Sequence, residues 1–517
     1  MEKQLSIIPK PVSIKYGEGI FQSAALPSIT GDEAFKNEIE IVKGQLNDDL
    51  AKSGKSAKFD GEKTLICQKS QKAENDEAYR LNILNDKIIL EAASPKGMYH
   101  ALQTFRQLAL SHFCNDIYID DIYTDGTFTL PCAEINDYPR FPWRGFMLDC
   151  SRHFYSVPFI KNTIDIISMH HISIFHWHLT DDQGWRLPVK EYPLLTEIGS
   201  RRQDLRRRWV SYVGGFYTEE EIQEIVDYAA KRHIEVVPEV DLPGHASAIL
   251  ASYPGLGCTG GPYCVEDHHG IFEDVLCAGN DQIFDLAEKI INTLTRLFPS
   301  KWVHIGGDEV KFNRWENCPK CQKRLEQLGL EKTPELQSWI THKLVQLLTE
   351  HGKIAIGWDE ILEDSQKFTL PKETVVMSWR GSNGGIRASS LGHKVIMSPN
   401  TEGCYLDYKN FNSYDEPGQT FSKEATAYKA YLMDPVTPEM SENDAVNILG
   451  GQGNLWSELI YAGKIAEYMI FPRLCAIAEA VWSPREGKDF DDFSARLAIH
   501  RKRLDSLGIN QYRGPLK

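Results

Sequence analysis

Two adjacent carboxylates, Asp308 and Glu309, follow an apolar run that ends in two glycines, Gly306 and Gly307. This pattern predicts a buried strand whose end lets backbone and ligand approach closely. Because neighbouring residues of an extended chain point to opposite sides, we expect the two carboxylates to occupy different environments. Different environments give two carboxyl groups different pKa values and different roles in acid–base chemistry. For these two residues taken alone, a strand end with a solvated acidic turn is the simpler alternative.

The elements that would position this pair form a repeating pattern. From Arg144 to Trp482, short apolar strands alternate with helical stretches, which favours a (β/α)8 TIM barrel with insertions. An open, doubly wound sheet is the alternative, but no Gly-x-Gly-x-x-Gly motif opens a helix. The eight predicted strands are Gly145–Asp149, Ile172–Leu179, Ile234–Val240, Trp302–Gly306, Ile354–Trp358, Thr374–Trp379, Lys394–Met397 and Ile448–Leu455.

A smaller domain is predicted before the barrel. Residues 1–138 are predicted to form an α+β domain. Residues 139–517 are predicted to form the barrel, with a C-terminal amphipathic helix over Asp489–Leu507. Prolines at 131, 139 and 142 mark the boundary. The predicted elements of the small domain are the strands Thr64–Gln68, Tyr79–Leu84 and Lys87–Glu91 and the helices Phe35–Ala51 and Lys96–Leu110. The fold class is therefore α/β, a TIM barrel preceded by a small α+β domain.

In such a barrel the carboxyl ends of the strands form the face that carries active sites. Carboxylates, aromatic rings and an arginine are expected together there. This composition suits a neutral polyol such as a sugar, because C–H faces stack on indoles while hydroxyls donate to carboxylates. The side chains predicted at this face are Asp149, Arg152, His176, His178, Asp181, Asp182, Glu239, Asp241, His245, Asp308, Glu309, Trp358, Trp379, Tyr405, Asp407, Trp456 and Glu458.

Two other classes of protein share parts of this pattern. His176 and His178 form a His-x-His pattern that metal-dependent barrel hydrolases also use, but such a site needs further histidines at later strand ends. Those ends carry Trp358, Trp379 and Tyr405 instead. A non-catalytic sugar-binding protein would keep the tryptophans and discard the acid, whereas both members of the acidic pair are present.

Composition excludes several partners. The 517 residues carry 57 basic and 72 acidic side chains, a net charge of −15, and no long basic run, which argues against a nucleic-acid surface. No apolar window is long enough for a transmembrane helix. A small oligosaccharide or glycan is the expected partner, and the oligomeric state stays open. Met1–Gln4 carries no signal-peptide core. The protein is expected in the cytoplasm or, if a signal was removed, in the periplasm or outside a bacterium.

Eleven cysteines are scattered along the chain, and the odd number leaves at least one thiol free or paired between chains. Cys318 and Cys321 form a lone Cys-x-x-Cys motif. Without a second pair at zinc-finger spacing, this motif predicts a local disulfide or two plain thiols rather than a zinc site. The same holds for Cys258 and Cys264, which lie in a glycine-rich loop. No metal and no other cofactor is predicted.

The same residues give the chain a resemblance to family 20 glycoside hydrolases, the β-N-acetylhexosaminidases, over nearly its whole length. Ile7-Ile8-Pro9-Lys10-Pro11 is similar to the opening of the small α/β domain that precedes the barrel in the bacterial type of this family. The motifs that carry the resemblance in the barrel are Phe141-Pro142-Trp143-Arg144-Gly145, Asp149-Cys150-Ser151-Arg152-His153, His176-Trp177-His178-Leu179-Thr180-Asp181-Asp182, Pro238-Glu239-Val240-Asp241-Leu242-Pro243-Gly244-His245, His304-Ile305-Gly306-Gly307-Asp308-Glu309, Gly357-Trp358-Asp359-Glu360, Ser378-Trp379, Tyr405-Leu406-Asp407 and Trp456-Ser457-Glu458.

The resemblance implies exo-action on a terminal β-linked N-acetylhexosamine by a retaining, substrate-assisted mechanism, in which the substrate's own 2-acetamido oxygen attacks the anomeric carbon. Glu309 would protonate the leaving oxygen and later deprotonate water. Asp308 would stay ionised and accept a hydrogen bond from the acetamido N–H. Tyr405 would hydrogen-bond the acetamido oxygen.

The resemblance also implies roles around these three residues. Trp358, Trp379 and Trp456 would wall the sugar and its acetamido methyl. Arg144, Asp407 and Glu458 would hold the outer hydroxyls, with Arg144 and Glu458 reaching O3 and O4; a structural ion pair of Arg144 with Asp149 is the alternative. Asp181 and His245 would link to Glu309 and tune its protonation. The preference for glucosamine or galactosamine, the natural glycan and the depth of the pocket are left open.

Overall fold

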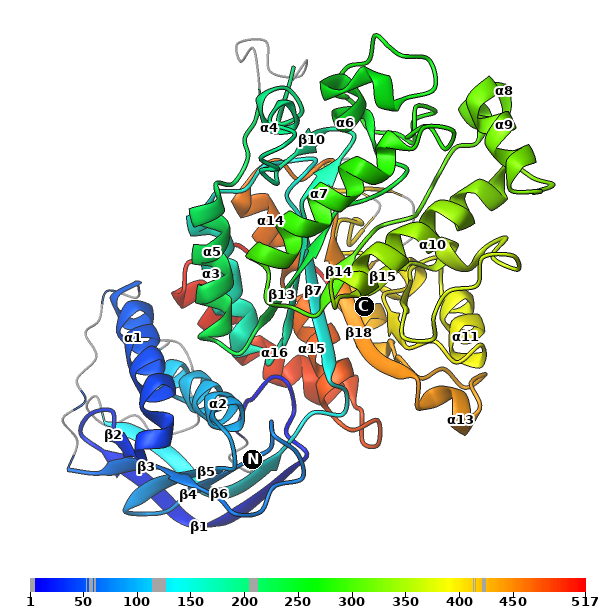
Figure 1. Cartoon of the computed structure of the whole chain (residues 1–517). Helices are drawn as coiled ribbons and strands as arrows, with labels where there is room; N and C mark the ends of the chain where they lie inside the picture. The colour runs from blue at the N-terminus through cyan, green and yellow to red at the C-terminus, as the bar shows by residue number, and fades with distance from the viewer. Residues whose placement is uncertain are drawn as a thin grey trace.

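The computed structural model describes residues 5–52, 54, 59, 62–113, 127–203, 213–411, 413, 415–420 and 425–517. Its larger part is a closed barrel of eight parallel strands surrounded by helices, and its smaller part is a six-stranded sheet covered on one face by two helices (Figure 1). The predicted TIM barrel with a preceding α+β domain is confirmed. Within the described ranges, no helix is long and apolar enough to cross a lipid bilayer.

All eight predicted barrel strands are present, and the last strand closes on the first. Gly450 pairs with Trp143, and the parallel register continues to Leu455 with Leu148. The apolar runs in the sequence predicted these strands correctly because parallel barrel strands are buried on both faces. In barrel order the strands are β7 (Trp143–Asp149), β8 (Ile174–His178), β13 (Glu235–Glu239), β14 (Trp302–His304), β15 (Ile354–Trp358), β16 (Val375–Ser378), β17 (Val395–Met397) and β18 (Ile448–Leu455).

Amphipathic helices cover the barrel. The helix α5, for example, begins with a capping box, in which the Thr218 hydroxyl accepts the Glu221 N–H and the Glu221 carboxylate accepts the Thr218 N–H. The long covering helices are α3 (Val157–Met169), α5 (Glu219–Ala230), α7 (Gln282–Leu297), α10 (Pro334–Glu350), α15 (Arg473–Trp482) and α16 (Phe490–Ser506).

Insertions follow the strands at the barrel end farthest from the small domain (Figure 1). This is the end at which the strands finish. The short helices in these insertions are α4 (Leu194–Glu197), α6 (Ser247–Ser252), α8 (Asn313–Asn317) and α9 (Pro319–Gln327).

The small domain has the strand order β1-β6-β4-β5-β3-β2. Its three predicted strands and two predicted helices are confirmed, but β1, β2 and β6 were missed. Pro131, taken as a boundary marker, lies inside β6 opposite an irregularity in β1 between Tyr16 and Ile20, where the ladder is interrupted. The elements are β1 (Ser13–Ser23), β2 (Ser28–Gly31), α1 (Lys36–Lys52), β3 (Thr64–Lys69), β4 (Tyr79–Ile83), β5 (Lys87–Ala92), α2 (Pro95–Phe113) and β6 (Phe128–Asp137).

Candidate active site

The acidic pair follows β14 on a turn that only glycine can make. Gly306 and Gly307 have φ values of 66° and 91°. A Cβ on Gly306 would lie 1.8 Å from Oδ1 of Asp241. The backbone N–H of Gly307 donates to the same oxygen at 2.9 Å. The close approach predicted from the two glycines is therefore made by a protein carboxylate, which packs against the turn that carries Asp308 and Glu309.

The two adjacent carboxylates differ in burial and in surroundings. The Asp308 side chain is 11% exposed and that of Glu309 is 29% exposed. Burial, together with the nearby Asp241 carboxylate, raises the pKa of Asp308 well above its ordinary value. Glu309 has a φ of 54°, a left-handed conformation that non-glycine residues adopt rarely and mainly at functional sites.

His245 lies between this pair and a second acidic pair. Its Nδ1 is 3.1 Å from Asp181 and 3.0 Å from Asp182, and its Nε2 is 3.8 Å from Asp308 and 3.6 Å from Glu309. Burial lowers the pKa of the imidazole, but Asp181 and Asp182 outweigh burial and raise this pKa well above its usual value. The structure thus places beside Glu309 an imidazole whose protonated form is favoured, with Asp181 at its other nitrogen.

Arg152 lies at the end of β7, among three acidic side chains. Its guanidinium is 2.9 Å from Asp181, 3.2 Å from Asp149 and 4.0 Å from Glu458. It also sits over the indole of Trp456, 4.9 Å from the ring centroid. Arg152 is therefore the guanidinium that the structure brings to Glu458 and the aromatic side chains.

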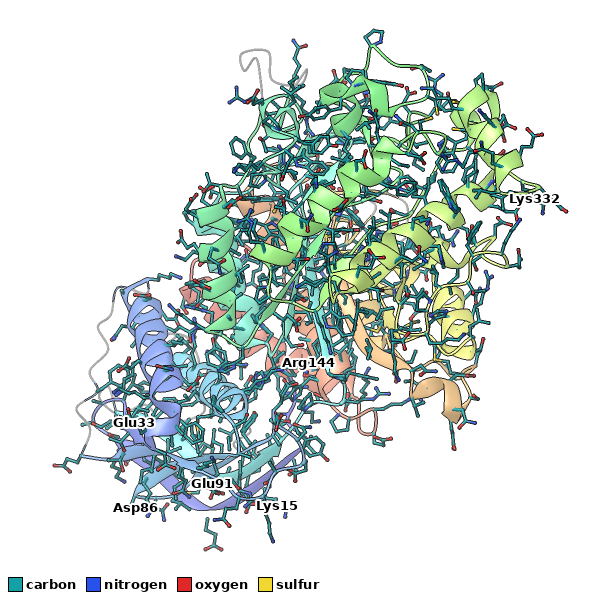
Figure 2. The ribbon with its side chains drawn as sticks, viewed as in Figure 1. Lys15, Glu33, Asp86, Glu91, Arg144 and Lys332 are labelled. Atoms are coloured by element: carbon teal, nitrogen blue, oxygen red, sulfur yellow. The ribbon has the colours of Figure 1, made fainter. Side chains whose placement is uncertain are left out.

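Arg144 does not reach this group, so the role predicted for it at the sugar hydroxyls is wrong. It stands at the opposite end of β7, five residues before Asp149, a span of about 17 Å along a strand. Its buried guanidinium donates to the carbonyls of Phe141 (2.7 Å) and His171 (2.8 Å) and pairs with Glu77 of the small domain. Figure 2 labels it where the barrel meets that domain. The alternative ion pair with Asp149 is excluded for the same reason.

Aromatic side chains from four successive strand ends form a continuous group. The ring centroids of Trp358 and Trp456 are 5.7 Å apart, and those of Tyr405 and Trp456 are 6.2 Å apart. Trp379 stacks on Tyr405 at 6.0 Å with an interplanar angle of 14°. All four predicted aromatic residues are thus brought together.

Carboxylates hold two of these indoles in place. Trp358 donates from Nε1 to Glu239 at 3.0 Å, and Trp379 donates to Glu360 at 2.9 Å. Burial, together with the neighbouring Asp308 and Asp359 carboxylates, raises the pKa of Glu360 to about 9. Glu360 thus supports the Trp379 indole through a hydrogen bond.

Glu239 also explains the His-x-His pattern. Its carboxylate is 2.9 Å from His176, 2.5 Å from His178 and 2.8 Å from His304. The side chains of His176, Glu239 and His304 are near enough to share an ion, yet each is fully buried beneath Trp358. The histidines therefore build the floor of the site rather than a metal centre open to substrate.

Three buried carboxylate oxygens at this face have no hydrogen-bond partner within the described part of the chain: Oδ1 of Asp308, Oδ1 of Asp407 and Oε2 of Glu458. Burial raises the pKa of Asp407 well above its ordinary value and also raises that of Glu458. Native proteins rarely leave buried polar atoms unpaired, because the desolvation penalty is then uncompensated. These oxygens are suited to accept hydrogen bonds from a ligand.

Comparison with known families identifies the family to which this fold belongs. The sequence model for the catalytic domain of glycosyl hydrolase family 20 matches residues 141–485, and the model for domain 2 of the same family matches residues 4–138. The chain belongs to glycosyl hydrolase family 20. The resemblance noted in the sequence is confirmed, and the chain is a glycoside hydrolase.

Individual family 20 members agree with this assignment. A β-hexosaminidase of Porphyromonas gingivalis is 41% identical over 439 residues, which are 84% of this chain and 55% of that protein. A β-hexosaminidase of Akkermansia muciniphila is 32% identical and is matched over 83% of its length by 82% of this chain. The chain thus spans just over half of the first relative.

The solved structure of an exo-β-N-acetylglucosaminidase of Vibrio harveyi, in complex with N-acetylglucosamine, superposes with a TM-score of 0.85 at 31% identity, covering 99% of this chain and 79% of that one. A β-N-acetylhexosaminidase of Bacteroides fragilis gives 0.81 at 28% identity, with 99% of each chain covered. The likeness therefore extends over both domains.

Proposed function

We propose that this chain is an exo-acting β-N-acetylhexosaminidase that releases terminal β-linked N-acetylglucosamine or N-acetylgalactosamine from oligosaccharides or glycoconjugates. The observation that carries the proposal is the set of three unpartnered carboxylate oxygens of Asp308, Asp407 and Glu458 beside four aromatic rings. A hexosamine offers the matching chemistry, because it has hydroxyl and amide donors around a ring with apolar C–H faces.

In the proposed reaction the 2-acetamido oxygen of the substrate attacks the anomeric carbon, and the configuration is retained over two displacements. Asp308 accepts the acetamido N–H through its unpartnered Oδ1. Burial beside Asp241 disfavours the ionised form of Asp308 in the resting protein. The positive charge that develops on the acetamido group favours that form, so the interaction is strongest in the transition state, where it accelerates the reaction.

Glu309 is the general acid and base of the proposal. It protonates the glycosidic oxygen in the first displacement and removes a proton from water in the second. The His245 imidazolium, 3.6 Å away, stabilises the carboxylate that remains after the first proton transfer. Asp181 holds His245 in that position.

The other side chains position the sugar. Tyr405 hydrogen-bonds the acetamido oxygen, and the sugar and its acetamido methyl pack against Trp358, Trp379 and Trp456. Asp407 and Glu458 accept hydrogen bonds from the outer hydroxyls. Arg152, rather than Arg144, is the cationic side chain that contacts these hydroxyls.

The test compares p-nitrophenyl β-N-acetylglucosaminide with the plain β-glucoside for the wild type, Asp308→Asn, Glu309→Gln and the exposed control Glu326→Gln. We expect turnover of the N-acetylated substrate only, and losses of about two to four powers of ten in the two site variants, the scale of acid–base and electrostatic catalysis. Equal cleavage of both substrates by the wild type would contradict the role of the acetamido group.

A further inference from the structure

Four cysteine sulfurs from two barrel insertions converge on one point. The Sγ atoms of Cys258 and Cys321 are 3.8 Å apart, those of Cys277 and Cys318 are 3.8 Å apart, and those of Cys277 and Cys321 are 3.6 Å apart. All four lie within 4.8 Å of one another, although Cys258 and Cys321 are separated by 63 positions in the sequence.

These distances do not fit the disulfides expected from the sequence. A disulfide has an S–S distance of about 2.05 Å, and every one of these cysteines is a free thiol in the structure. Cys264, the partner suggested for Cys258, is exposed and does not belong to the cluster. Of the two alternatives predicted for Cys318 with Cys321 and for Cys258 with Cys264, the local disulfide is therefore wrong, and the plain thiols agree with the structure.

The distances fit a tetrahedral metal centre. Zinc bonds thiolate sulfur at about 2.3 Å, which places the corners of a ZnS4 tetrahedron about 3.8 Å apart. We propose that Cys258, Cys277, Cys318 and Cys321 bind one zinc ion in a structural site. Four protein ligands leave no open coordination position, so the ion would have no role in the hydrolysis itself.

The backbone around the cluster is built for close approach. A Cβ on Gly279 would lie only 2.2 Å from the carbonyl carbon of Lys320, so the two insertions touch where only glycine fits. The Trp315 indole donates to the Leu276 carbonyl at 2.8 Å, and Gln322 donates to the Trp315 carbonyl at 2.9 Å. These contacts hold the sulfurs in place from both sides.

Two of the four cysteines lie at the start of α9. Cys318 is the N-cap of this nine-residue helix, and Cys321 lies in its first turn. The positive end of the helix dipole would lie beside the negatively charged zinc–thiolate group. Zinc binding would displace the four thiol protons and leave a site of net charge −2.

The site would join the two insertions that carry the catalytic groups. The Leu276 N–H, next to Cys277, donates to the Pro243 carbonyl at 3.1 Å, two residues before His245. On the other side, Glu309 precedes α8 by only a few residues, and Arg314 of α8 pairs with Asp274 at 2.7 Å. The metal would therefore fix the insertion that carries His245 against the one that carries Glu309.

The first experiment measures metal in the purified full chain by elemental analysis. We expect about one zinc per chain. Growth in cobalt should give the intense visible absorption of a tetrahedral cobalt–thiolate centre. Cys277→Ser and Cys321→Ser should lose the metal, whereas Cys264→Ser, a control in the same insertion, should keep it.

A second measurement needs no variant. Titration of the wild type with a mercurial reagent, in the presence of a zinc indicator, should release one zinc as the four thiols react. Chelation should lower the melting temperature by several degrees, and added zinc should restore it, because a ligand of the native state alone stabilises that state. The proposal is overturned by less than about 0.1 metal per chain after preparation with zinc, by iron in place of zinc, or by disulfides among these cysteines in intact-mass analysis.

Discussion

The two ends of the barrel bury charges in opposite ways. At the end that meets the small domain, Glu77 pairs with Arg144, Lys96 and His100, and Arg106 pairs with Asp49 and Asp165. At the other end, one buried oxygen each of Asp308, Asp407 and Glu458 has no hydrogen-bond partner among the residues that the structure describes.

The difference is visible in the direction of the pKa shifts. Burial raises the pKa of Glu77, but Arg144 and His100 outweigh it and hold this pKa well below the usual range. The pKa of Asp308 is instead raised, by burial and by Asp241. Buried carboxylates that are fully paired stabilise the fold, and those left short of donors are available to a ligand.

Replacing each of the two arginines, Arg144 and Arg152, with alanine tests this comparison most strongly. Arg152→Ala should lower kcat/KM by about two to four powers of ten, because a buried cation beside Glu458 is lost. Arg144→Ala should leave kcat/KM of the folded protein within about twofold and lower the free energy of unfolding by about 3–5 kcal/mol, because Glu77 loses its guanidinium partner and keeps only Lys96 and His100. Urea denaturation and initial rates on the N-acetylated substrate measure both. Equal activity losses in the two variants would contradict the assignment.

Stability should change in opposite directions when one carboxylate at each end is neutralised. Asp308→Asn should stabilise the protein by about 1–3 kcal/mol at neutral pH, because it removes a buried carboxyl group that is ionised in the unfolded chain but is disfavoured as a carboxylate in the folded protein. The folded-state pKa of Asp308 is raised, so the wild type loses stability as pH rises from about 4 through that pKa, and the gain of the variant grows over this window.

Glu77→Gln should destabilise the protein. The stability from Glu77 is present above its unfolded pKa of about 4.3 and is lost as pH falls toward its lowered folded pKa. Melting curves from about pH 2 to about pH 8 measure both variants and cover both pH windows. A destabilised Asp308→Asn would contradict the view that Asp308 is strained in the resting protein.

The pH dependence of catalysis also tests the raised pKa of Asp308. If ionised Asp308 is needed, kcat/KM falls as pH drops through its raised pKa in the free enzyme. The acetamido group favours the ionised form, so the acid limb of kcat should lie about one pH unit lower than that of kcat/KM. Coincident limbs, or a limb that survives in Asp308→Asn, would argue against this origin.

Tyr405→Phe should have the smallest effect. It removes one hydrogen bond to the substrate and keeps the ring that stacks on Trp379. We expect a loss of about tenfold in kcat, the scale of a single neutral hydrogen bond, with a change in KM of less than about threefold. Tyr192→Phe, outside the site, serves as the control. An unchanged kcat would show that the Tyr405 hydroxyl does not contribute to catalysis.

The barrel was predictable because its strands are buried on both faces and therefore appear as apolar runs. The missed strands β1 and β6 lack this pattern, since β1 is largely exposed and contains Gly17 and Gly19, and β6 contains Pro131. Their pairing depends on contacts between distant segments, which local pattern does not encode.

The site was predictable where a motif follows a strand end, as for Asp308, Glu309 and Tyr405. Arg144 was misassigned because its role was taken from the resemblance alone, although it lies at the start of its strand. Arg152 follows Asp149 at the carboxyl end of β7, and strand direction already placed it at the face that carries active sites. The cysteine cluster was missed because Cys258 and Cys277 are isolated in the sequence and become neighbours of Cys318 and Cys321 only after folding.

The paired charges at the base of the barrel also bear on how such proteins are inherited. The carboxylate that satisfies Arg144 belongs to the small domain. A gene shortened to encode the barrel alone would leave this guanidinium without its partner inside the protein. Separation of the two domains would therefore break this ion pair, and we expect the two domains to be inherited as one unit.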